Sequence, residues 1–243
     1  MMFDKHLIPN AATASNLLFG MCSLISTFEG NFFWSGVFIL LALVADGMDG
    51  RLARYFGVSS EFGKEMDSLC DLGSFGIAPA VLAYAFCLHS YGYFGIAVVI
   101  FFALCGMWRL ARFNVNTNVV HGFFMGLAIP SGGCIVATTT MLFLELGIDP
   151  TSYGFVYPIS MIVVAYLMVS HVHYPDFKGS GEKIYLLSKI FAVIMFISLV
   201  GACYYVGGTA VIWKACLAAG FSTYAIFGIV NSLCHVMKDV NND

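Results

Sequence analysis

The feature that most constrains this chain is a set of long stretches without any Asp, Glu, Lys or Arg. Four such stretches cover residues 72–108, 113–144, 190–213 and 215–237. A helix that spans a bilayer needs about 20 apolar residues. Only 10% of the residues are charged, whereas a soluble domain carries about a quarter. So few charges cannot solvate a globular surface, and the chain is expected to fold in a lipid bilayer.

The length rule predicts an all-α fold, a polytopic membrane helical bundle with about eight transmembrane helices. The expected spans are residues 8–28, 31–54, 63–88, 92–113, 123–145, 152–172, 184–206 and 210–235. The longest charge-free stretch is divided at residues 89–92, where polar and flexible residues interrupt it. Six or seven spans are the alternative. Since no linker or low-complexity tract is present, residues 1–243 are predicted to form a single domain.

The distribution of charge predicts that both termini are cytoplasmic. With that topology, the outer loops receive Glu29, Glu145 and Asp149. The basic residues of the predicted cytoplasmic side are Lys5, Arg51, Arg54, Lys64, Arg109, Arg112, Lys178, Lys183, Lys189 and Lys238. Among the basic residues, Lys214 alone falls near the other side, where it is expected to snorkel to the headgroups. This is the positive-inside pattern, and it indicates a multi-pass protein of the cell membrane.

Four aspartates stand at the edge of two of the predicted helices. Asp46 and Asp49 are three residues apart, and Asp67 and Asp71 are four apart, so each pair lies on one helical face. A carboxylate inside a membrane helix costs roughly 2.5–3.5 kcal/mol at the helix centre. The apolar runs on either side place both pairs at the cytoplasmic edge of the hydrocarbon. The two helices are expected to be antiparallel, with a short loop near residues 55–62.

Four carboxylates at one depth repel one another strongly in a low dielectric. Either some of them are protonated or cations neutralise them. Oxygen ligands favour hard divalent ions such as Mg²⁺ or Mn²⁺, and two such ions would balance the charge and form a clamp for displacement at phosphorus. The alternative is that the acids cap helix ends and face the cytosol. That alternative explains one or two aspartates better than four at helical spacing.

Small residues accompany the aspartates on the same helical faces. Gly50 and Ala53 stand four residues after the first and second aspartate, and Gly63 stands four before the third. Missing side chains leave a groove in which a bulky ligand can approach the backbone. Arg54 adds a guanidinium suited to phosphate. A site of this kind at headgroup depth suits a lipid whose reactive pyrophosphate lies at the membrane interface.

The segment 46–71 resembles the signature of the CDP-alcohol phosphatidyltransferase family, D-x2-D-G-x2-A-R-x8-G-x3-D-x3-D. The matching positions are Asp46, Asp49, Gly50, Ala53, Arg54, Gly63, Asp67 and Asp71. The resemblance implies that the aspartates hold two divalent ions, Mg²⁺ or Mn²⁺, that bind the pyrophosphate of a CDP-lipid. It implies that Asp71 is also the general base, and that Gly50, Ala53, Arg54 and Gly63 contact the nucleotide. A homodimer is expected on the same ground.

Four further segments are similar to the phosphatidylserine synthases of that family. They are residues 8–16, 109–115, 126–130 and 167–178; the departures are Ala128, where the family usually has Pro, and Asp176, where a small residue is usual. The resemblance implies transfer of the phosphatidyl group from CDP-diacylglycerol to L-serine, giving phosphatidylserine and CMP. The expected partners are these two substrates and the bilayer, with no nucleic acid.

Serine carries a carboxylate, which needs fixed cations beside an anionic metal site. Arg109 and Arg112, three residues apart, can supply a guanidinium fork, and Lys178 is a weaker candidate. Anchoring at the cytoplasmic face is the alternative role of these residues. Asn10 and Thr13 share a face of the first helix with Asn16, which indicates either a polar wall touching the nucleotide or hydrogen bonds between helices.

The same residues also allow other functions. Glycerol 3-phosphate or inositol phosphate as acceptor would want a denser basic pocket than this chain offers. CDP-archaeol as donor would differ in its tails alone, which the residues do not reveal. An ion-coupled transporter also uses intramembrane carboxylates. It predicts acids near the bilayer midplane and repeated halves, whereas these acids lie in one hairpin at one edge.

Overall fold

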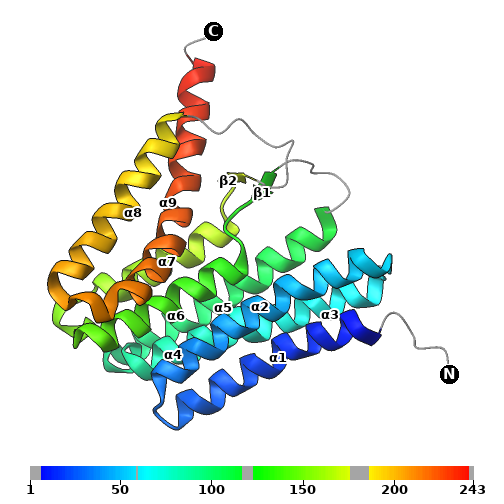
Figure 1. Ribbon diagram of the computed structural model, residues 1–243, viewed down its shortest axis with the longest axis horizontal. Coiled ribbons are helices and arrows are strands. Elements are labelled where there is room, and N and C mark those ends of the chain that lie inside the picture. The colour runs from blue at the N-terminus through cyan, green and yellow to red at the C-terminus, as the bar shows by residue number, and fades with distance from the viewer. Residues whose placement is uncertain (1–6, 59, 117–122, 176–185, 241–243) are drawn as a thin grey trace.

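The structure, a computed structural model, describes residues 7–58, 60–116, 123–175 and 186–240, which form a bundle of helices (Figure 1). The α-helices are α1 (Leu7–Phe28), α2 (Phe32–Phe56), α3 (Glu61–Asp71), α4 (Ala78–Phe86), α5 (Gly92–Asn116), α6 (Ile129–Leu146), α7 (Val156–Val169), α8 (Leu186–Gly207) and α9 (Ile212–Val240). A π-helical turn (Leu72–Ile77) joins α3 to α4 without a break, and 3₁₀ turns (Leu88–Tyr91, Pro150–Tyr153 and Thr209–Val211) precede α5, α7 and α9.

Seven of the described helical segments are long and apolar enough to cross a membrane. The prediction of an all-α bundle with many spans is therefore confirmed. The remaining expected span, residues 152–172, corresponds to α7, which has 14 residues. At 1.5 Å per residue it reaches about 21 Å, less than the roughly 30 Å of a hydrocarbon core. The expected break at residues 89–92 is also present, because Gly92 takes a positive φ of 56° there.

One predicted boundary is wrong. A helix was expected over residues 123–145, but α6 begins at Ile129, and Phe123–Met125 forms the strand β1. This strand pairs antiparallel with β2 (His173–Pro175). Gly126 has a φ of 80°, which a helix does not allow, and its N–H donates to the carbonyl of Val172 at 2.8 Å. The chain therefore turns between β1 and α6, a feature that apolar composition does not reveal.

The buried core lies between α2, the α4 region, α5, α6 and α7. Its large members include Ile39, Phe75, Phe102, Ile129 and Met168, all fully buried. Outside this core, α8 packs against α9, and the hairpin of α8 and α9 leans away from the other helices (Figure 1). Because most side chains of α8 point outward and are apolar, this hairpin presents a surface suited to lipid.

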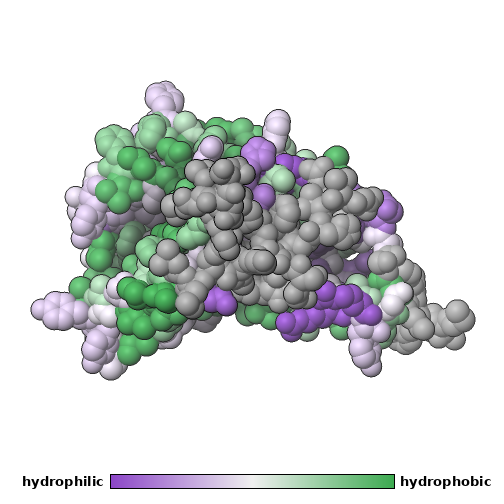
Figure 2. Space-filling view, turned by 90° about the horizontal axis from the view of Figure 1, so that it is seen from above, coloured by the Kyte–Doolittle hydropathy of each residue, from purple (hydrophilic) through white to green (hydrophobic). Residues whose placement is uncertain are grey.

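The polar surface is concentrated on one side. Figure 2 shows hydrophilic residues mainly toward the side on which the N-terminus lies in Figure 1, while hydrophobic side chains cover much of the opposite side. The first side holds the beginning of α1, the end of α2 and the beginning of α3 (Figure 1). The paired aspartates lie toward this polar end of the bundle.

Candidate active site

A short connection brings the two pairs of aspartates face to face. Helix α2 ends at Phe56, and its C-cap Gly57 takes the left-handed conformation with a φ of 63°, a conformation that glycine adopts without strain. Helix α3 begins after Ser60, whose hydroxyl accepts the N–H of Gly63 at 3.0 Å as an N-cap. The predicted antiparallel hairpin is confirmed, with a short connection between Gly57 and Ser60 (Figure 1).

Three carboxylates converge across this hairpin. Asp46 and Asp49 of α2 and Asp67 of α3 each offer an oxygen, and these oxygens lie within 4.8 Å of one another. At that distance two ionised carboxylates repel by roughly 3.5 kcal/mol for an effective dielectric constant of about 20. Oδ1 of Asp67 is buried without a hydrogen-bond partner. Crowded anionic oxygens with an unsatisfied member fit a hard divalent cation, which takes oxygen ligands.

Asp71 lies beside this group of three but is not part of it. Its carboxyl group is adjacent to that of Asp46, and the residue is 7% exposed. Its Oδ1 accepts a hydrogen bond from Nδ2 of Asn16 at 3.0 Å. The π-helical turn begins at the next residue, and such turns occur often at functional sites. The fourth aspartate therefore has surroundings that differ from those of the other three.

Helix α1 closes the site from the other side. The hydroxyl of Thr13 donates to Oδ2 of Asp49 at 2.7 Å, one turn before the bond from Asn16 to Asp71. Asn10, one turn earlier on the same face, lines the pocket beside Thr13. The sequence left two roles open for this face, a polar wall or helix–helix hydrogen bonds. The face has both features, because Thr13 lines the pocket and also bonds to α2.

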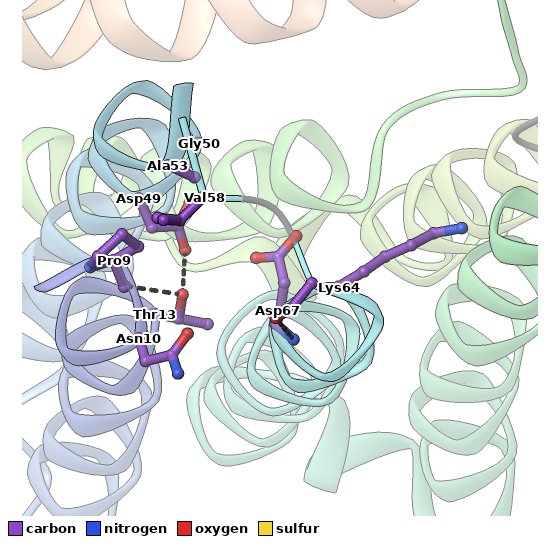
Figure 3. A pocket seen from close by; sticks show the side chains of 11 residues that line it. Pro9, Asn10, Thr13, Asp49, Gly50, Ala53, Val58, Lys64 and Asp67 are labelled. Atoms are coloured by element: carbon purple, nitrogen blue, oxygen red, sulfur yellow. Dashed lines mark hydrogen bonds between the residues drawn. The ribbon is translucent and has the colours of Figure 1, made fainter. Parts of the chain in front are cut away.

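A pocket of about 220 Å³ opens between α1, α2 and α3. Figure 3 shows Asp49 and Asp67 facing each other across it, while the side chain of Lys64 extends away from both. The residues that line the pocket are Pro9, Asn10, Thr13, Asp49, Gly50, Ala53, Val58, Ser60, Gly63, Lys64 and Asp67. The structure thus brings together Gly50, Ala53 and Gly63, as the spacing predicted.

Not every predicted site residue reaches this pocket. Arg54 is exposed and does not line it. Ser60 and Lys64 do line it, although neither residue was predicted as part of the site. Ser60 carried a usable signal, because a serine three residues before Gly63 at a helix start is a typical N-cap. Lys178 lies outside the described residues.

The two arginines of α5 have separate surroundings. Arg109 is 8% exposed, and its guanidinium interacts electrostatically with Asp71 and Asp46. Arg112 instead donates to backbone carbonyls at the end of α7, reaching Val169 at 2.8 Å and Ser170 at 3.1 Å. A third bond joins it to the carbonyl of Met125 in β1, at 3.0 Å. The predicted fork of two guanidiniums is therefore split, with Arg109 alone beside the carboxylates.

Known proteins resemble this chain over most of its length. A CDP-diacylglycerol–serine O-phosphatidyltransferase of Helicobacter pylori (strain J99) is 31% identical over 98% of this chain and 95% of that protein. A protein of the same name from Bacillus subtilis is 33% identical over 73% of this chain and 95% of its own length. An archaetidylserine synthase of Methanothermobacter thermautotrophicus is 36% identical over 75% of this chain and 78% of that protein.

The family-level comparison covers the site itself. The family model described as CDP-alcohol phosphatidyltransferase matches residues 6–172, which include α1, the aspartate hairpin and Arg109. The matched region is well over half of the chain, and the full-length relatives agree with it. With its four aspartates on one helical hairpin and its apolar spans, this chain belongs to the CDP-alcohol phosphatidyltransferase family.

Proposed function

We propose that this protein transfers the phosphatidyl group of CDP-diacylglycerol to the hydroxyl of L-serine, releasing phosphatidylserine and CMP. The observation that carries the proposal is the group of three carboxylates, two of which, Asp49 and Asp67, line the pocket between α1, α2 and α3, with a fourth buried carboxylate beside the group. Serine as acceptor is supported by the names of the relatives from Helicobacter pylori and Bacillus subtilis.

The pocket between α1, α2 and α3 is the proposed place of the CDP headgroup. Gly50, Ala53 and Gly63 keep its wall free of bulk, so that the nucleotide approaches the backbone. Asp46, Asp49 and Asp67 would hold the divalent cations, Mg²⁺ or Mn²⁺, and Asp71 can share one through its neighbour Asp46. Bound there, the cations would neutralise the pyrophosphate and the CMP leaving group.

Asp71 is the proposed general base. The serine oxygen attacks the phosphorus that carries the lipid, the bond from this phosphorus to the CMP oxygen breaks, and Asp71 takes the proton of the serine hydroxyl. Arg109 is buried beside Asp71 and is the proposed partner of the serine carboxylate. Because the guanidinium of Arg112 donates hydrogen bonds to backbone carbonyls, we assign Arg112 a structural role.

The same proposal places the site on the cytoplasmic side of the cell membrane and the protein in a homodimer. The orientation is supported by the basic residues around the aspartate hairpin, such as Arg51 and Arg54. Labelling of a cysteine placed at Ser60 or at Asp149 with an impermeant reagent, in cells and in broken membranes, tests the orientation. Light scattering of the detergent-solubilised protein tests the dimer.

The experiment that tests the reaction is CMP release by the purified protein with CDP-diacylglycerol, Mg²⁺ or Mn²⁺, and serine. The matched control lacks serine, and a third sample contains EDTA. We expect CMP that depends on serine and disappears with EDTA. Release with a different alcohol would keep the carboxylate site and refute the serine pocket. No release with any acceptor, in folded protein, would refute the transferase proposal for this chain.

The donor tails form a second arm of the same assay, because one relative is named archaetidylserine synthase. CDP-diacylglycerol and CDP-archaeol would be compared at equal concentration in mixed micelles. A preference for CDP-archaeol would change the lipid assignment and leave the acceptor and the site unchanged.

A further inference from the structure

Asn16 of α1 is a fully buried amide whose two ends have different surroundings. Its Nδ2 donates to Oδ1 of Asp71 at 3.0 Å, while its own Oδ1 is buried without any hydrogen-bond partner. The amide orientation follows from chemistry, because an amide oxygen facing a carboxylate would leave two acceptors in contact. A buried acceptor without a partner is unfavourable. An asparagine cannot supply its Nδ2 donor without this oxygen, so the buried acceptor accompanies the bond to Asp71.

The backbone around Asn16 is held as firmly as its side chain. The hydroxyl of Ser74, in the π-helical turn after Asp71, donates to the backbone carbonyl of Asn16 at 2.9 Å. One turn further along α1, Gly20 packs directly against Ser74, and a Cβ at Gly20 would lie 2.9 Å from the Ser74 Cα. Helix α1 and the turn after Asp71 therefore form one tight contact, with the Asn16–Asp71 bond at its end.

The pocket between α1, α2 and α3, which is the proposed place of the CDP headgroup, does not include Asn16. Thr13, one turn earlier on α1, lines that pocket and bonds to Asp49, a member of the group of three carboxylates. Asn16 bonds instead to the carboxylate outside that group, and it does not line the pocket. The two hydrogen-bond donors of α1 thus bond to different carboxylates. Thr13 bonds to Asp49, in the pocket proposed for the CDP headgroup, and Asn16 bonds to Asp71, the proposed base.

We infer that Asn16 is a positioning residue for the transfer step: its amide engages Oδ1 of Asp71, so that the other carboxylate oxygen is presented to the acceptor hydroxyl. The inference rests on the proposed function, in which Asp71 takes the proton. In this role Asn16 acts through Asp71 and touches neither substrate. Its loss should therefore lower kcat and leave the binding of both substrates nearly unchanged.

The test compares Asn16→Leu, of similar shape but without a donor, with the wild type in the serine-dependent CMP assay. We expect kcat to fall at least 30-fold, with the KM values for serine and CDP-diacylglycerol changed less than threefold. Binding of CDP in the presence of Mg²⁺, measured by calorimetry, should also change less than threefold. The matched control is Ser23→Ala, which removes another buried bond of α1, to Ser35 on α2, far along the helix from the carboxylates. It should keep wild-type kcat.

A wild-type kcat in folded Asn16→Leu, or a loss confined to KM, would overturn the inference. If that variant does not fold, Asn16→Ser and Asn16→Ala replace it, because serine can still donate a hydrogen bond. At least fivefold higher kcat for the serine variant supports the inference, and equal values overturn it. If the wild type uses another alcohol, the serine assignment fails and the comparison is made with that alcohol. If no alcohol supports CMP release, both proposals fall.

Discussion

The two ends of the bundle treat buried charge in opposite ways. At the end where α6 meets α9, Lys214 is 7% exposed and forms a salt bridge with Glu145. The same ammonium group lies over the rings of Phe33, at 5.1 Å, and Trp213, at 5.2 Å. At the end where α1, α2 and α3 meet, oxygens of three carboxylates lie within 4.8 Å of one another. The guanidinium of Arg109 interacts electrostatically with Asp71 and Asp46 there, without forming a direct salt bridge.

The difference separates a structural charge from a functional one. A lysine that is paired with a carboxylate and covered by aromatic rings is satisfied inside the protein, so it stabilises the contact of α6, α9 and α2. The carboxyl groups at the other end accept hydrogen bonds from neutral donors, Thr13 and Asn16, and together they are an excess of acidic groups. Such an excess is unfavourable in the free protein and is expected where a cation and a charged substrate bind.

The largest expected effect is on Asp71, the carboxylate that the proposal uses as base. Asp71→Asn keeps the shape of the side chain and removes its ability to take a proton, so CMP release should fall by about a thousandfold. The assay is CMP release with serine, on protein that elutes as the wild type does. Asp149→Asn, at the other end of the bundle, is the matched control and should retain activity. Wild-type turnover in Asp71→Asn would remove the proposed base.

Asp67 tests whether the excess charge is unfavourable without a cation. Asp67→Asn removes one of the repelling carboxylates, so in EDTA its Tm should be higher than that of the wild type. Mg²⁺ or Mn²⁺ at 100 times the Kd should raise the unfolding free energy of the wild type by about 2.7 kcal/mol, and its Tm accordingly. The same metal should raise the Tm of the variant less. Activity should fall at least a hundredfold. An equal shift of Tm by the metal in both proteins would contradict a cation site at Asp67.

The arginines of α5 test which guanidinium serves the substrate. Arg109→Gln should raise the KM for serine about tenfold or more, because a buried cation near Asp71 would be lost. Arg112→Gln should leave that KM within threefold and lower stability by about 2 kcal/mol, since it loses bonds to backbone carbonyls at the end of α7. Kinetics in serine and thermal unfolding separate the two. The opposite assignment would follow if Arg112→Gln alone raised the KM.

The Lys214–Glu145 salt bridge should affect stability and not activity. Glu145→Ala leaves Lys214 buried without its partner and should lower stability by about 1–3 kcal/mol. Activity per folded molecule should stay within twofold of the wild type. The double variant Glu145→Leu/Lys214→Met should recover most of the loss, because apolar side chains of similar size need no partner. Loss of activity at full stability would show that this end also serves the reaction.

The smallest expected effect concerns Asp149, in the exposed turn before the 3₁₀ helix. Bonds from the backbone N–H and the hydroxyl of Thr151, at 2.9 and 2.8 Å, hold the pKa of Asp149 below its usual value. A lowered folded pKa gives stability that is present above the unfolded pKa, about 3.9, and is lost as the pH falls through the folded value. Asp149→Ala should lower the Tm slightly at pH 7, with a smaller difference at the lowest pH the protein tolerates. A constant difference would exclude this origin.

Much of the fold could be predicted because a membrane helix is specified by residues that are close together in the sequence. The charge-free stretches and the positions of the aspartates depend on sequence spacing alone, and seven long apolar helices agree with them. The start of α6 could not be predicted, because Gly126 turns there to satisfy a carbonyl at Val172, a residue far along the chain. The expected snorkelling of Lys214 was wrong for the same reason, since its partner Glu145 lies on another helix.

The sequence by itself determined the class of the protein and the faces on which its chemistry lies. Helical spacing places Asp46 with Asp49 and Asp67 with Asp71, and the glycines beside them follow from the same period. The tertiary structure alone decided how these faces meet. It brought three carboxylates together, placed Asp71 in a hydrogen bond with Asn16, and directed Arg112 to backbone carbonyls at the end of α7. The physical reason is that spacing along a helix is a local property, whereas pairing between helices depends on packing over the whole bundle.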